Sequence, residues 1–543
     1  MMQEVRCAVS GTIPKIPKNF QVYFGPPGTG KTTTLSKLVQ HYAEDDGPES
    51  LLLTSFTRAA AHELAGRELP VSAHGIGTLH SHCYHGLDRP RIAESHVKDW
   101  NEAFPYYPMT ATARTVHDTA TTTRGALPDE HGPRHEELAG DTLLSAYNLV
   151  RAAMQPATAC AAPVRHFIRL WEDWKGQHGY LDFTDVLTRG LAVLRVAPGN
   201  PATIIVDEAQ DLTPLQWAII AQWSQHAQRT IAGGDDDQAL YSWCGADPDL
   251  LLQADASAKR VLPHSYRLPQ TIYLHAQQYL EAITRREPKR WTSNGTEGWC
   301  EPADYQWRNP ESLAPLVAQT LEEPWGSCMI LAPCSYMLTD LVTMLRAEGI
   351  PFANPWRRRR GDWNPLYYAG KGIASVTRLL DFLRPPERLW TWRELASWVG
   401  ILRKRGNLLP EATVLLTLHE DEDRVCPLED VRRLFTPDAL SGALSGSLVW
   451  FEDRIRKQYA HGMAFPLKAY RRYGRVGLAE DPRIYVGTCH SVKGGEADRV
   501  VLFTELSRSF QQARAQGGDT ADAVERMLYV GATRAREELY VIG

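Results

Sequence analysis

The sequence lacks the features that mark several large classes of protein. No two of its nine cysteines have Cys-x-x-Cys spacing, which argues against zinc ribbons and iron–sulfur clusters and favours a reduced, intracellular setting. No run of about 18 apolar residues exists, and the N-terminus lacks the apolar core of a signal peptide, so we expect no membrane-spanning helix. The formal net charge of −5 provides no global basic field. Any contact with nucleic acid must therefore come from local patches or from stacking.

Short, continuously apolar runs recur along the 543 residues, a length that suggests about three to four domains. They end in glycine, polar or acidic residues, and helical stretches fall between them. Runs of this kind are typical of strands buried on both faces of a parallel sheet, so the alternation predicts an α/β fold. The predicted strands are FQVYF (20–24), LLLTSF (51–56), TIIVDE (203–208), TIAGGD (230–235), CMILAP (328–333), RIYVGTCH (483–490), RVVLFTE (499–505) and ELYVIG (538–543).

The predicted strands form two groups, one before about residue 265 and one after about residue 325, which indicates two sheets. Each group is interrupted. Residues 86–160 are helical or loop-like with a polar tract, and residues 385–478 are rich in tryptophan and arginine and contain no buried-strand run. We interpret both segments as insertions into α/β domains.

A phosphate-binding loop follows the first predicted strand and opens a helix. GPPGTGKT (25–32) matches the pattern G-x-x-x-x-G-K-[ST] in full. Its glycines let successive N–H groups point at phosphate oxygens, and the helix N-terminus adds positive partial charge. Lys31 would neutralise the β- and γ-phosphates, and Thr32 would ligate Mg²⁺. The predicted ATP-binding residues here are Gly25, Pro26, Pro27, Gly28, Thr29, Gly30, Lys31, Thr32 and Thr33.

The segment TIIVDEAQD (203–211) supplies carboxylates at the end of another predicted strand. An aspartate there can hold Mg²⁺, and the neighbouring glutamate can orient or deprotonate the attacking water. We assign Asp207 to the metal and Glu208 to the water. Phosphoryl transfer also benefits from a cation on the developing charge, for which HSYRLPQ (264–270) offers Arg267 and YVGATRAREEL (529–539) offers Arg534.

These residues resemble the superfamily 1 DNA helicases of the UvrD, Rep and PcrA type. The motifs appear in the order of that family and span nearly the whole chain. They are GPPGTGKT (25–32), TSFTRAAAHEL (54–64), GTLHSHC (77–83), DFTDVL (182–187), VDEAQD (206–211), AGGDDDQALYSWCGAD (232–247), LPHSYR (262–267), VGTCHSVKGGEADRVVL (486–502) and RMLYVGATRA (526–535).

The resemblance implies roles for single residues of the nucleotide site. Gln238 would sense the γ-phosphate, and Arg267 and Arg534 would complete the site. Tyr266 resembles the tyrosine that stacks on adenine, and Glu496 resembles the glutamate that contacts ribose. The aspartates of GGDDDQ (233–238) would cap the strand end near Mg²⁺ and hold the turn.

Other matched residues are implied to contact DNA. Tyr241 and Trp243 would face single-stranded DNA, where stacking a base on a ring contributes about 1–3 kcal/mol whatever the sequence. Phe56 and His80 resemble residues lining the DNA path. Two alternatives stay open from the residues themselves: Trp243 as a core residue under a loop, and His80 as a satisfied core histidine.

The sequence departs from the family pattern in places. The Leu-Asn-x-x-Gln block, whose glutamine reads adenine, has no counterpart ahead of the phosphate-binding loop, and Cys244 stands where relatives often have arginine. NPWRRRRGDW (354–363) and KAYRRYGR (468–475) mix arginines with aromatics, which suits either DNA contact or a solvated loop.

We therefore expect an ATP- and Mg²⁺-dependent helicase that is stimulated by single-stranded DNA and moves 3′ to 5′. Its partners would be single-stranded DNA, single/double-strand junctions and loading proteins, in repair, recombination or replication, in the cytoplasm of a bacterial or virus-infected cell. The expected fold has two RecA-like P-loop domains with parallel sheets, each carrying a mainly helical insertion. The expected boundaries are 1–85 with 161–265, an insertion at 86–160, 266–384 with 479–543, and an insertion at 385–478. The alternatives are a translocase that strips proteins from DNA with little strand separation, and an ATP-switched DNA-binding scaffold.

Overall fold

The computed structural model describes residues 19–55, 69–72, 74–110, 139–253, 258–323, 326–354, 363–366, 373–384 and 387–543. The chain divides into two compact units. The first comprises Met1–Glu301 and Thr504–Leu539, and the second comprises Pro302–Phe503 and Tyr540–Gly543. Among the described residues, every helix is too short or too polar to cross a lipid bilayer.

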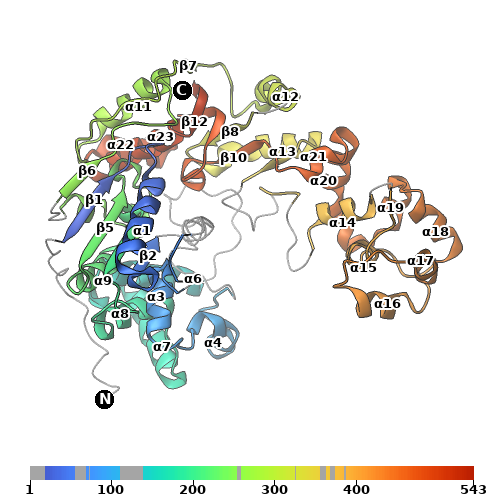
Figure 1. Ribbon diagram of the computed structural model, residues 1–543, viewed down its shortest axis with the longest axis horizontal. Coiled ribbons are helices and arrows are strands. Elements are labelled where there is room, and N and C mark those ends of the chain that lie inside the picture. Colours follow the sequence, from blue (N-terminus) through green and yellow to red (C-terminus); the bar gives the residue numbers. More distant parts are fainter. Residues whose placement is uncertain are drawn as a thin grey trace. The chain divides into compact units, whose positions relative to one another are not determined.

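The first unit is built on a six-stranded sheet in the order β3-β2-β4-β5-β1-β6, in which all neighbouring strands are parallel (Figure 1). In register, Phe24 lies beside Gly234, and Ser55 lies beside Asp207. The carboxyl ends of β1, β4 and β5 therefore meet at one edge of the sheet. The strands are β1 (Phe20–Phe24), β2 (Leu51–Ser55), β3 (Ile76–Thr78), β4 (Thr203–Asp207), β5 (Arg229–Gly234) and β6 (Ala258–Val261).

Apolar side chains are buried on both faces of this sheet. Along β1, Val22 and Phe24 belong to one core cluster with the helices α3 (Leu79–Gly86), α8 (Phe183–Val193) and α9 (Pro214–Ser224), whereas Tyr23 belongs to another with α1 (Lys31–Asp46). Because successive side chains of a strand point to opposite faces, a strand covered on both sides must be apolar at every position. This is the reason for the continuous runs in the sequence.

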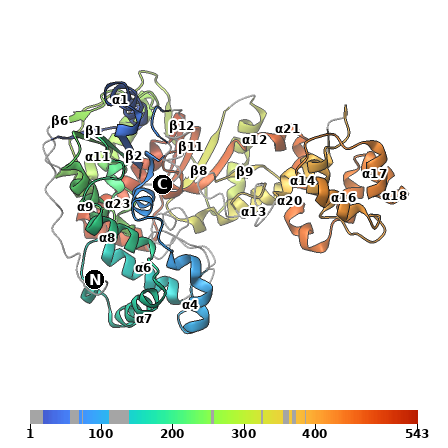
Figure 2. The same ribbon diagram turned by 60° about the horizontal axis from the view of Figure 1, so that its bottom comes forward.

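The helices of the predicted first insertion share an aromatic core. Trp100 contacts Phe167, Trp171 and Trp174, with ring centroids 5.7, 5.0 and 5.5 Å away. Figures 1 and 2 show α4, α6 and α7 side by side at one end of the unit. These helices are α4 (Val97–Ala103), α6 (Ala139–Ala152) and α7 (Ala162–His178), and the remaining helices of this unit are α10 (Pro248–Leu252), α11 (Gln270–Ala282), α22 (Arg508–Gln516) and α23 (Gly518–Ala532).

A second six-stranded sheet has the order β7-β12-β11-β8-β10-β9. The pairs β8–β10, β8–β11 and β9–β10 are parallel. The strands are β7 (Trp299–Pro302), β8 (Cys328–Ala332), β9 (Phe352–Ala353), β10 (Ile484–Thr488), β11 (Ala497–Phe503) and β12 (Ala535–Ile542). The two parallel-strand sheets confirm the predicted α/β fold, and every run predicted as a strand contains one. The strands that the prediction missed, β3, β6, β7 and β9, are the edge strands of the two sheets.

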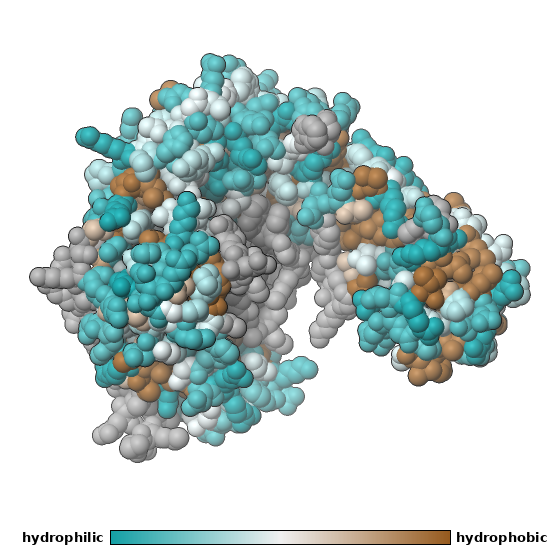
Figure 3. Space-filling model, in the orientation of Figure 1, coloured by the Kyte–Doolittle hydropathy of each residue, from teal (hydrophilic) through white to brown (hydrophobic). Residues whose placement is uncertain are grey.

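The second unit also carries a helical part in the segment predicted as the second insertion. Its core contains Trp390, Trp392 and Trp398, which are fully buried. Figure 3 shows brown apolar patches on this part, where Val414 and Leu418 are among the exposed apolar residues. The helices of this unit are α12 (Ala314–Glu322), α13 (Thr339–Glu348), α14 (Ser375–Phe382), α15 (Trp392–Val399), α16 (Ala412–His419), α17 (Leu428–Leu434), α18 (Pro437–Leu444), α19 (Leu448–Arg454), α20 (Lys457–Tyr473) and α21 (Val476–Ala479).

Candidate active site

The phosphate-binding loop leaves β1 and enters α1 as predicted. Gly28 and Gly30 have φ angles of 72° and 75°, in the left-handed region that favours glycine, and Gly30 is the N-cap of α1. Gly25 has a different requirement, since a Cβ at this position would lie 2.6 Å from the Cβ of Lys31. The loop geometry therefore depends on glycine at each of these positions, and it turns the N-terminus of α1 toward the strand ends.

The segment that carries Tyr266 and Arg267 packs directly on this loop. The Ser265 hydroxyl donates to the Pro27 carbonyl over 2.8 Å, and the Tyr266 N–H donates to the Gly28 carbonyl over 2.8 Å. Tyr266 is 74% exposed, and a Cβ built on Gly30 would lie 3.8 Å from its ring. An exposed ring beside the loop is available to a base, so this geometry supports the predicted contact with adenine.

Lys31 meets both carboxylates predicted at the end of β4. Its ammonium forms ion pairs with Asp207 and Glu208, and its side chain is only 12% exposed. Burial alone would lower the pKa of Lys31, but the two carboxylates raise it above its ordinary value. Burial raises the pKa of Asp207, and Lys31 opposes that shift. The structure therefore joins the loop lysine to the predicted metal ligand and to the predicted water-activating group.

The donor set at this point suits Mg²⁺. The Asp207 carboxylate and the Thr32 hydroxyl are oxygen ligands of the kind Mg²⁺ prefers, and it usually completes its shell with phosphate oxygens and waters. Asp207 is 3% exposed, and its ion pair with Lys31 places it at the start of α1, where Thr32 is the next residue. The two predicted metal ligands are compatible with a nucleotide-bound Mg²⁺ ion.

Glu208 has a strained backbone and a buried partner that the sequence did not indicate. Its φ angle is 55°, an unusual value for a residue other than glycine. The Gln210 amide donates to the Glu208 carboxylate over 2.6 Å, and the Gln210 carbonyl accepts from the Asp235 N–H over 3.0 Å. Gln210 is fully buried. Gln210 thus links the turn after β4 to the end of β5. The sequence AQD (209–211) gave no indication of this role.

Gln238 and Arg534 contact one another. An Nη of Arg534 donates to Oε1 of Gln238 over 3.0 Å, and Nε of Arg534 donates to the Val530 carbonyl over 2.8 Å. Arg534 is 1% exposed and lies between α23 and β12. Arg267 donates to the Thr533 carbonyl over 3.4 Å. All six residues predicted as catalytic therefore lie in the first unit, and Arg267 and Arg534 are near one another at the end of α23.

The three aspartates after β5 are neutralised by cations far along the chain. Asp235 caps the turn by accepting from the Asp237 N–H over 3.3 Å, in keeping with the predicted turn-holding role. The Lys289 ammonium lies 2.9 Å from Asp235, 2.5 Å from Asp236 and 2.8 Å from Asp237. Arg286 donates to both oxygens of Asp237 over 2.8 and 2.7 Å. Sequence reasoning missed both cations, because a basic residue outside a motif normally indicates solvated surface.

The predicted DNA-contacting residues have different surroundings. Tyr241 is 6% exposed and belongs to the core of the first unit, so its ring offers little surface to a base. Trp243 is partly buried against the same core, with its ring centroid 6.3 Å from that of Tyr241. His80 is half-buried in the first turn of α3. Phe56 lies outside the described residues. Of Tyr241 and Trp243, Trp243 is thus the less buried, and it is the ring with more surface left for a base.

A core histidine does exist in this motif, two residues after His80. His82 is buried, and its Nε2 lies 3.0 Å from the Leu53 carbonyl. Burial lowers the pKa of His82 to about 4, so the ring is neutral at physiological pH. Cys244 is also buried, with its thiol 3.0 Å from the Tyr241 carbonyl.

Two further predicted features lie in the second unit. Glu496 is exposed and immediately precedes β11. In the segment 468–475, Arg472 pairs with Glu348 over 2.9 Å, Arg471 pairs with Glu452, and Arg475 donates to the Leu380 carbonyl over 2.9 Å. These partners favour a solvated, ion-paired surface over DNA contact for that basic patch, although residues 468–473 form the end of α20 and not a loop. Most of the other patch, 354–363, lies outside the described residues.

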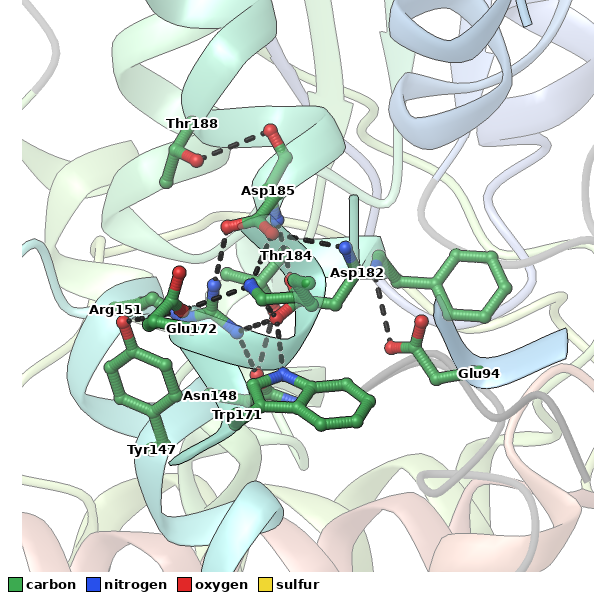
Figure 4. A network of polar contacts seen from close by, with 12 residues as sticks. Glu94, Tyr147, Asn148, Arg151, Trp171, Glu172, Asp182, Thr184, Asp185 and Thr188 are labelled. Carbon is green, nitrogen blue, oxygen red and sulfur yellow. Dashed lines mark hydrogen bonds and ion pairs between the residues drawn. The ribbon is translucent and has the colours of Figure 1, made fainter. Parts of the chain in front are cut away.

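Three carboxylates in the first unit lie close enough together to hold a metal ion, but lysine and arginine side chains form ion pairs with them. Glu172, Asp182 and Asp185 converge. Lys175 pairs with all three. Arg151 pairs with Asp182 and Asp185 (Figure 4). Asp182 is also the N-cap of α8, which explains the motif DFTDVL structurally. This cluster is an ion-pair network that joins α6, α7 and α8.

Comparison with known proteins matches two family models. The UvrD/REP helicase N-terminal domain matches residues 13–259, and the UvrD-like helicase C-terminal domain matches residues 483–542. DNA helicase II of Salmonella typhimurium is 22% identical over 96% of this chain and 82% of its own length. UvrD2 of Mycobacterium bovis, named an ATP-dependent DNA helicase, is 24% identical over 94% and 75%. PcrA of Leuconostoc citreum, also named an ATP-dependent DNA helicase, is 24% identical over 49% of this chain and 38% of its own.

Proposed function

Because this chain belongs to the family of UvrD-like helicases and is an ATP-dependent DNA helicase of that type, we propose that it is a motor stimulated by single-stranded DNA that moves 3′ to 5′. Its fuel is ATP bound with Mg²⁺ at the phosphate-binding loop. Its track is single-stranded DNA, and its substrates for unwinding are single/double-strand junctions.

One observation carries the proposal. A continuous series of polar contacts runs from the predicted water-activating group to the predicted arginine. Gln210 bonds Glu208 and Asp235, Asp235 accepts from Gln238 over 2.7 Å, and Gln238 accepts from Arg534. Groups that act on the nucleophile, on the γ-phosphate and on the developing charge are thereby held in one network, as phosphoryl transfer requires.

The residues of this chain would divide the chemistry as follows. Lys31 would hold the β- and γ-phosphates, and Glu208 would orient and deprotonate the attacking water. Gln238 would contact the γ-phosphate, and Arg267 and Arg534 would stabilise the charge that develops on it. When bound through Thr32 and Asp207, Mg²⁺ would neutralise phosphate charge. Tyr266 would stack on adenine, and Glu496 would contact ribose.

Contact with DNA is assigned to Trp243, with Phe56 and His80 along the same path. Stacking a base on an indole is tolerant of sequence, as translocation demands. Trp243 follows Gln238 by five residues in one loop. A change at the nucleotide therefore has a short covalent route to the residue that would hold a base.

We propose the four-part organisation expected from the sequence, with RecA-like domains at 1–85 with 161–265 and at 266–384 with 479–543, and helical insertions at 86–160 and 385–478. The setting would be DNA repair, recombination or replication in the cytoplasm, with loading proteins as partners.

The test is ATP turnover of the full chain with single-stranded DNA, duplex DNA, RNA and no polymer. We expect stimulation that is strongest with single-stranded DNA. Trace turnover that no polymer stimulates would instead favour an ATP-switched scaffold. Strand separation measured beside streptavidin displacement then distinguishes an unwinding motor from a translocase that only strips proteins, and substrates with a 3′ or a 5′ single-stranded tail report the polarity.

A further inference from the structure

The side-chain amide of Gln238 is held between an acceptor and a donor. Its Nε2 donates to Oδ2 of Asp235 over 2.7 Å, and its Oε1 accepts from Arg534 over 3.0 Å. An ionised carboxylate only accepts hydrogen bonds, and a guanidinium only donates them. Rotating the amide by a half turn would set two donors against each other at Arg534. A protonated Asp235 could donate to Gln238 instead of only accepting from it, so an ionised Asp235 supports the observed orientation of the amide.

Asp235 stays ionised although burial and two neighbouring carboxylates disfavour its negative charge. It is 1% exposed, and Asp236 and Asp237 are its neighbours. The Lys289 ammonium, itself fully buried, lies 2.9 Å from Asp235 and contacts the other two carboxylates as well. Lys289 is the cation that directly pairs with Asp235 among the described residues, because Arg286 is directed at Asp237.

The charged groups around Asp235 come from several elements. Asp236 and Asp237 belong to its own turn, and Lys289 and Arg286 follow α11. Tyr529 lies near the end of α23 and Arg534 follows that helix, and Tyr529 interacts electrostatically with both Asp235 and Arg534. Burial, with the two neighbouring carboxylates, raises the pKa of Asp235 to about 6, and Lys289 holds it from rising further. Asp235 is thus ionised at neutral pH by a narrow margin that Lys289 provides.

We propose that Lys289 is a positioning residue for ATP hydrolysis, which orients the Gln238 amide, and through it the Arg534 guanidinium, by keeping Asp235 a pure hydrogen-bond acceptor. This inference rests on the proposed function and adds to it a residue outside the nucleotide motifs. Lys289 pairs with Asp235, Asp236 and Asp237, and among these three carboxylates Asp235 is the one that accepts from the Gln238 amide, so the proposed effect on Gln238 passes through Asp235.

The test compares full-length Lys289→Met with the wild-type chain in ATP turnover with saturating single-stranded DNA between pH 5.5 and pH 9. We expect kcat at pH 7 to fall about 10- to 100-fold, as for a displaced reacting group, with the KM for ATP within about twofold. The wild-type kcat should lose half its value near the pKa of Asp235. That midpoint should rise by about two to three pH units in Lys289→Met, which is the rise that a 10- to 100-fold loss at pH 7 requires, so that alkaline pH partly restores turnover.

Two further variants separate positioning from folding. Asp235→Asn removes one excess negative charge from the cluster and keeps its shape, but an amide can donate as well as accept. We expect Asp235→Asn to fold and to lose kcat by about 10- to 100-fold as well. Its kcat should not fall further on acidification through pH 6, because it has no carboxyl at position 235 to titrate. Lys175→Met is the matched control, since Lys175 is also buried and also pairs with three carboxylates. It should keep the wild-type kcat and pH profile per folded molecule.

The outcomes are distinct. If wild-type turnover is stimulated by DNA while Lys289→Met and Asp235→Asn keep its kcat and acid limb, the positioning role is wrong and the proposed function stands. If Lys289→Met does not fold, Asp235→Asn decides by the same two readouts. Wild-type protein without DNA-stimulated turnover would overturn the proposed function itself.

Discussion

Two lysines buried in the first unit have nearly the same surroundings and different tasks. Lys289 lies among Asp235, Asp236 and Asp237, and Lys175 lies among Glu172, Asp182 and Asp185. In each cluster an arginine is the second cation, Arg286 in one and Arg151 in the other. Both clusters therefore hold three carboxylates against two cations around a buried lysine, although Glu172 is 38% exposed whereas the three aspartates around Lys289 are fully buried.

The difference lies at the borders of the clusters. The Lys175 cluster is closed by structural groups: Trp171 donates to Asp182 over 2.9 Å, and the Asp182 carboxylate caps α8 (Figure 4). The Lys289 cluster continues through Asp235 to Gln238 and Arg534. Identical ionic composition thus serves stability in one place and the orientation of a reactive group in the other, and the neighbours decide which.

The largest effect is expected from removing another lysine of the unit, Lys31, which pairs with Asp207 and Glu208, the two carboxylates proposed to act in the reaction. Lys31→Ala should reduce DNA-stimulated ATP turnover below detection, because phosphate charge loses its cation. The measurement is steady-state phosphate release. Wild-type rates in this variant would refute the role of the phosphate-binding loop.

Arg534→Ala tests the far end of the network that borders the Lys289 cluster. We expect kcat to fall by about 10³-fold, in the range known for arginines that stabilise transferring phosphoryl groups. Equilibrium binding of a fluorescent ATP analogue should be largely kept, so that only turnover is lost. Unchanged turnover would count against the cation role.

Lys175→Ala should lower the stability of the protein and leave its turnover unchanged, the opposite of the result expected for Arg534→Ala. Leaving buried carboxylates without their cation costs about 3–5 kcal/mol of folding free energy, whereas kcat per folded molecule should be retained. Urea unfolding and active-site titration measure the two quantities. A loss of kcat beyond the loss of folded protein would show that this cluster also reaches the active site.

Trp243→Ala should weaken binding of single-stranded DNA by about 1–3 kcal/mol, the worth of one stacked base. Fluorescence anisotropy with a labelled oligonucleotide measures it. Tyr241→Phe is the control, because Tyr241 is a core residue and the substitution retains its ring. Equal affinity in Trp243→Ala and wild type would mean that the indole only supports the loop.

Glu94 gives the Lys175 cluster a pH dependence of its own. Burial, with the nearby Asp182 carboxylate, raises the pKa of Glu94 to about 8. Since the folded state prefers the protonated acid, this group supports folding at low pH, and the support is lost as pH rises through 8. Glu94→Gln should therefore gain at least about 1 kcal/mol over wild type at pH 8.5 and much less at pH 5. Urea unfolding at both values measures this, and equal stability gains at the two would exclude the titration.

Much of the fold was predictable because burial on both faces of a sheet leaves a local trace. Strands such as β1 and β4 are flanked on both sides, so each reads as a continuous apolar run. Edge strands are only partly covered: β6 is half-buried or exposed at every position, and its sequence AKRV contains two cations. No apolar run marks such a strand, which is why β3, β6 and β7 were missed. The strand β9 is buried but only two residues long, too short to form a recognisable run.

The candidate site was predictable where one short motif contains the whole requirement. The phosphate-binding loop needs glycines, a lysine and a hydroxyl within eight residues, and Asp207 and Glu208 are adjacent at a strand end. The placement of Gln210, Lys289 and Arg286 could not be predicted in the same way. Their partners are brought to them by folding, and nothing in the local sequence distinguishes a buried ion-paired lysine from a solvated one.

The sequence by itself determined the α/β class, the internal strands, the phosphate-binding loop and the ordered motifs of a UvrD-like helicase. Tertiary structure alone decided which strands form the edges and that Tyr241 is buried in the core while Trp243 is partly buried. It also decided that Lys289 pairs with three aspartates that lie about fifty residues earlier in the chain, Asp235, Asp236 and Asp237. The physical reason is range. Backbone geometry and apolar periodicity act between neighbours in sequence, whereas burial and ion pairing depend on which distant segments the fold packs together.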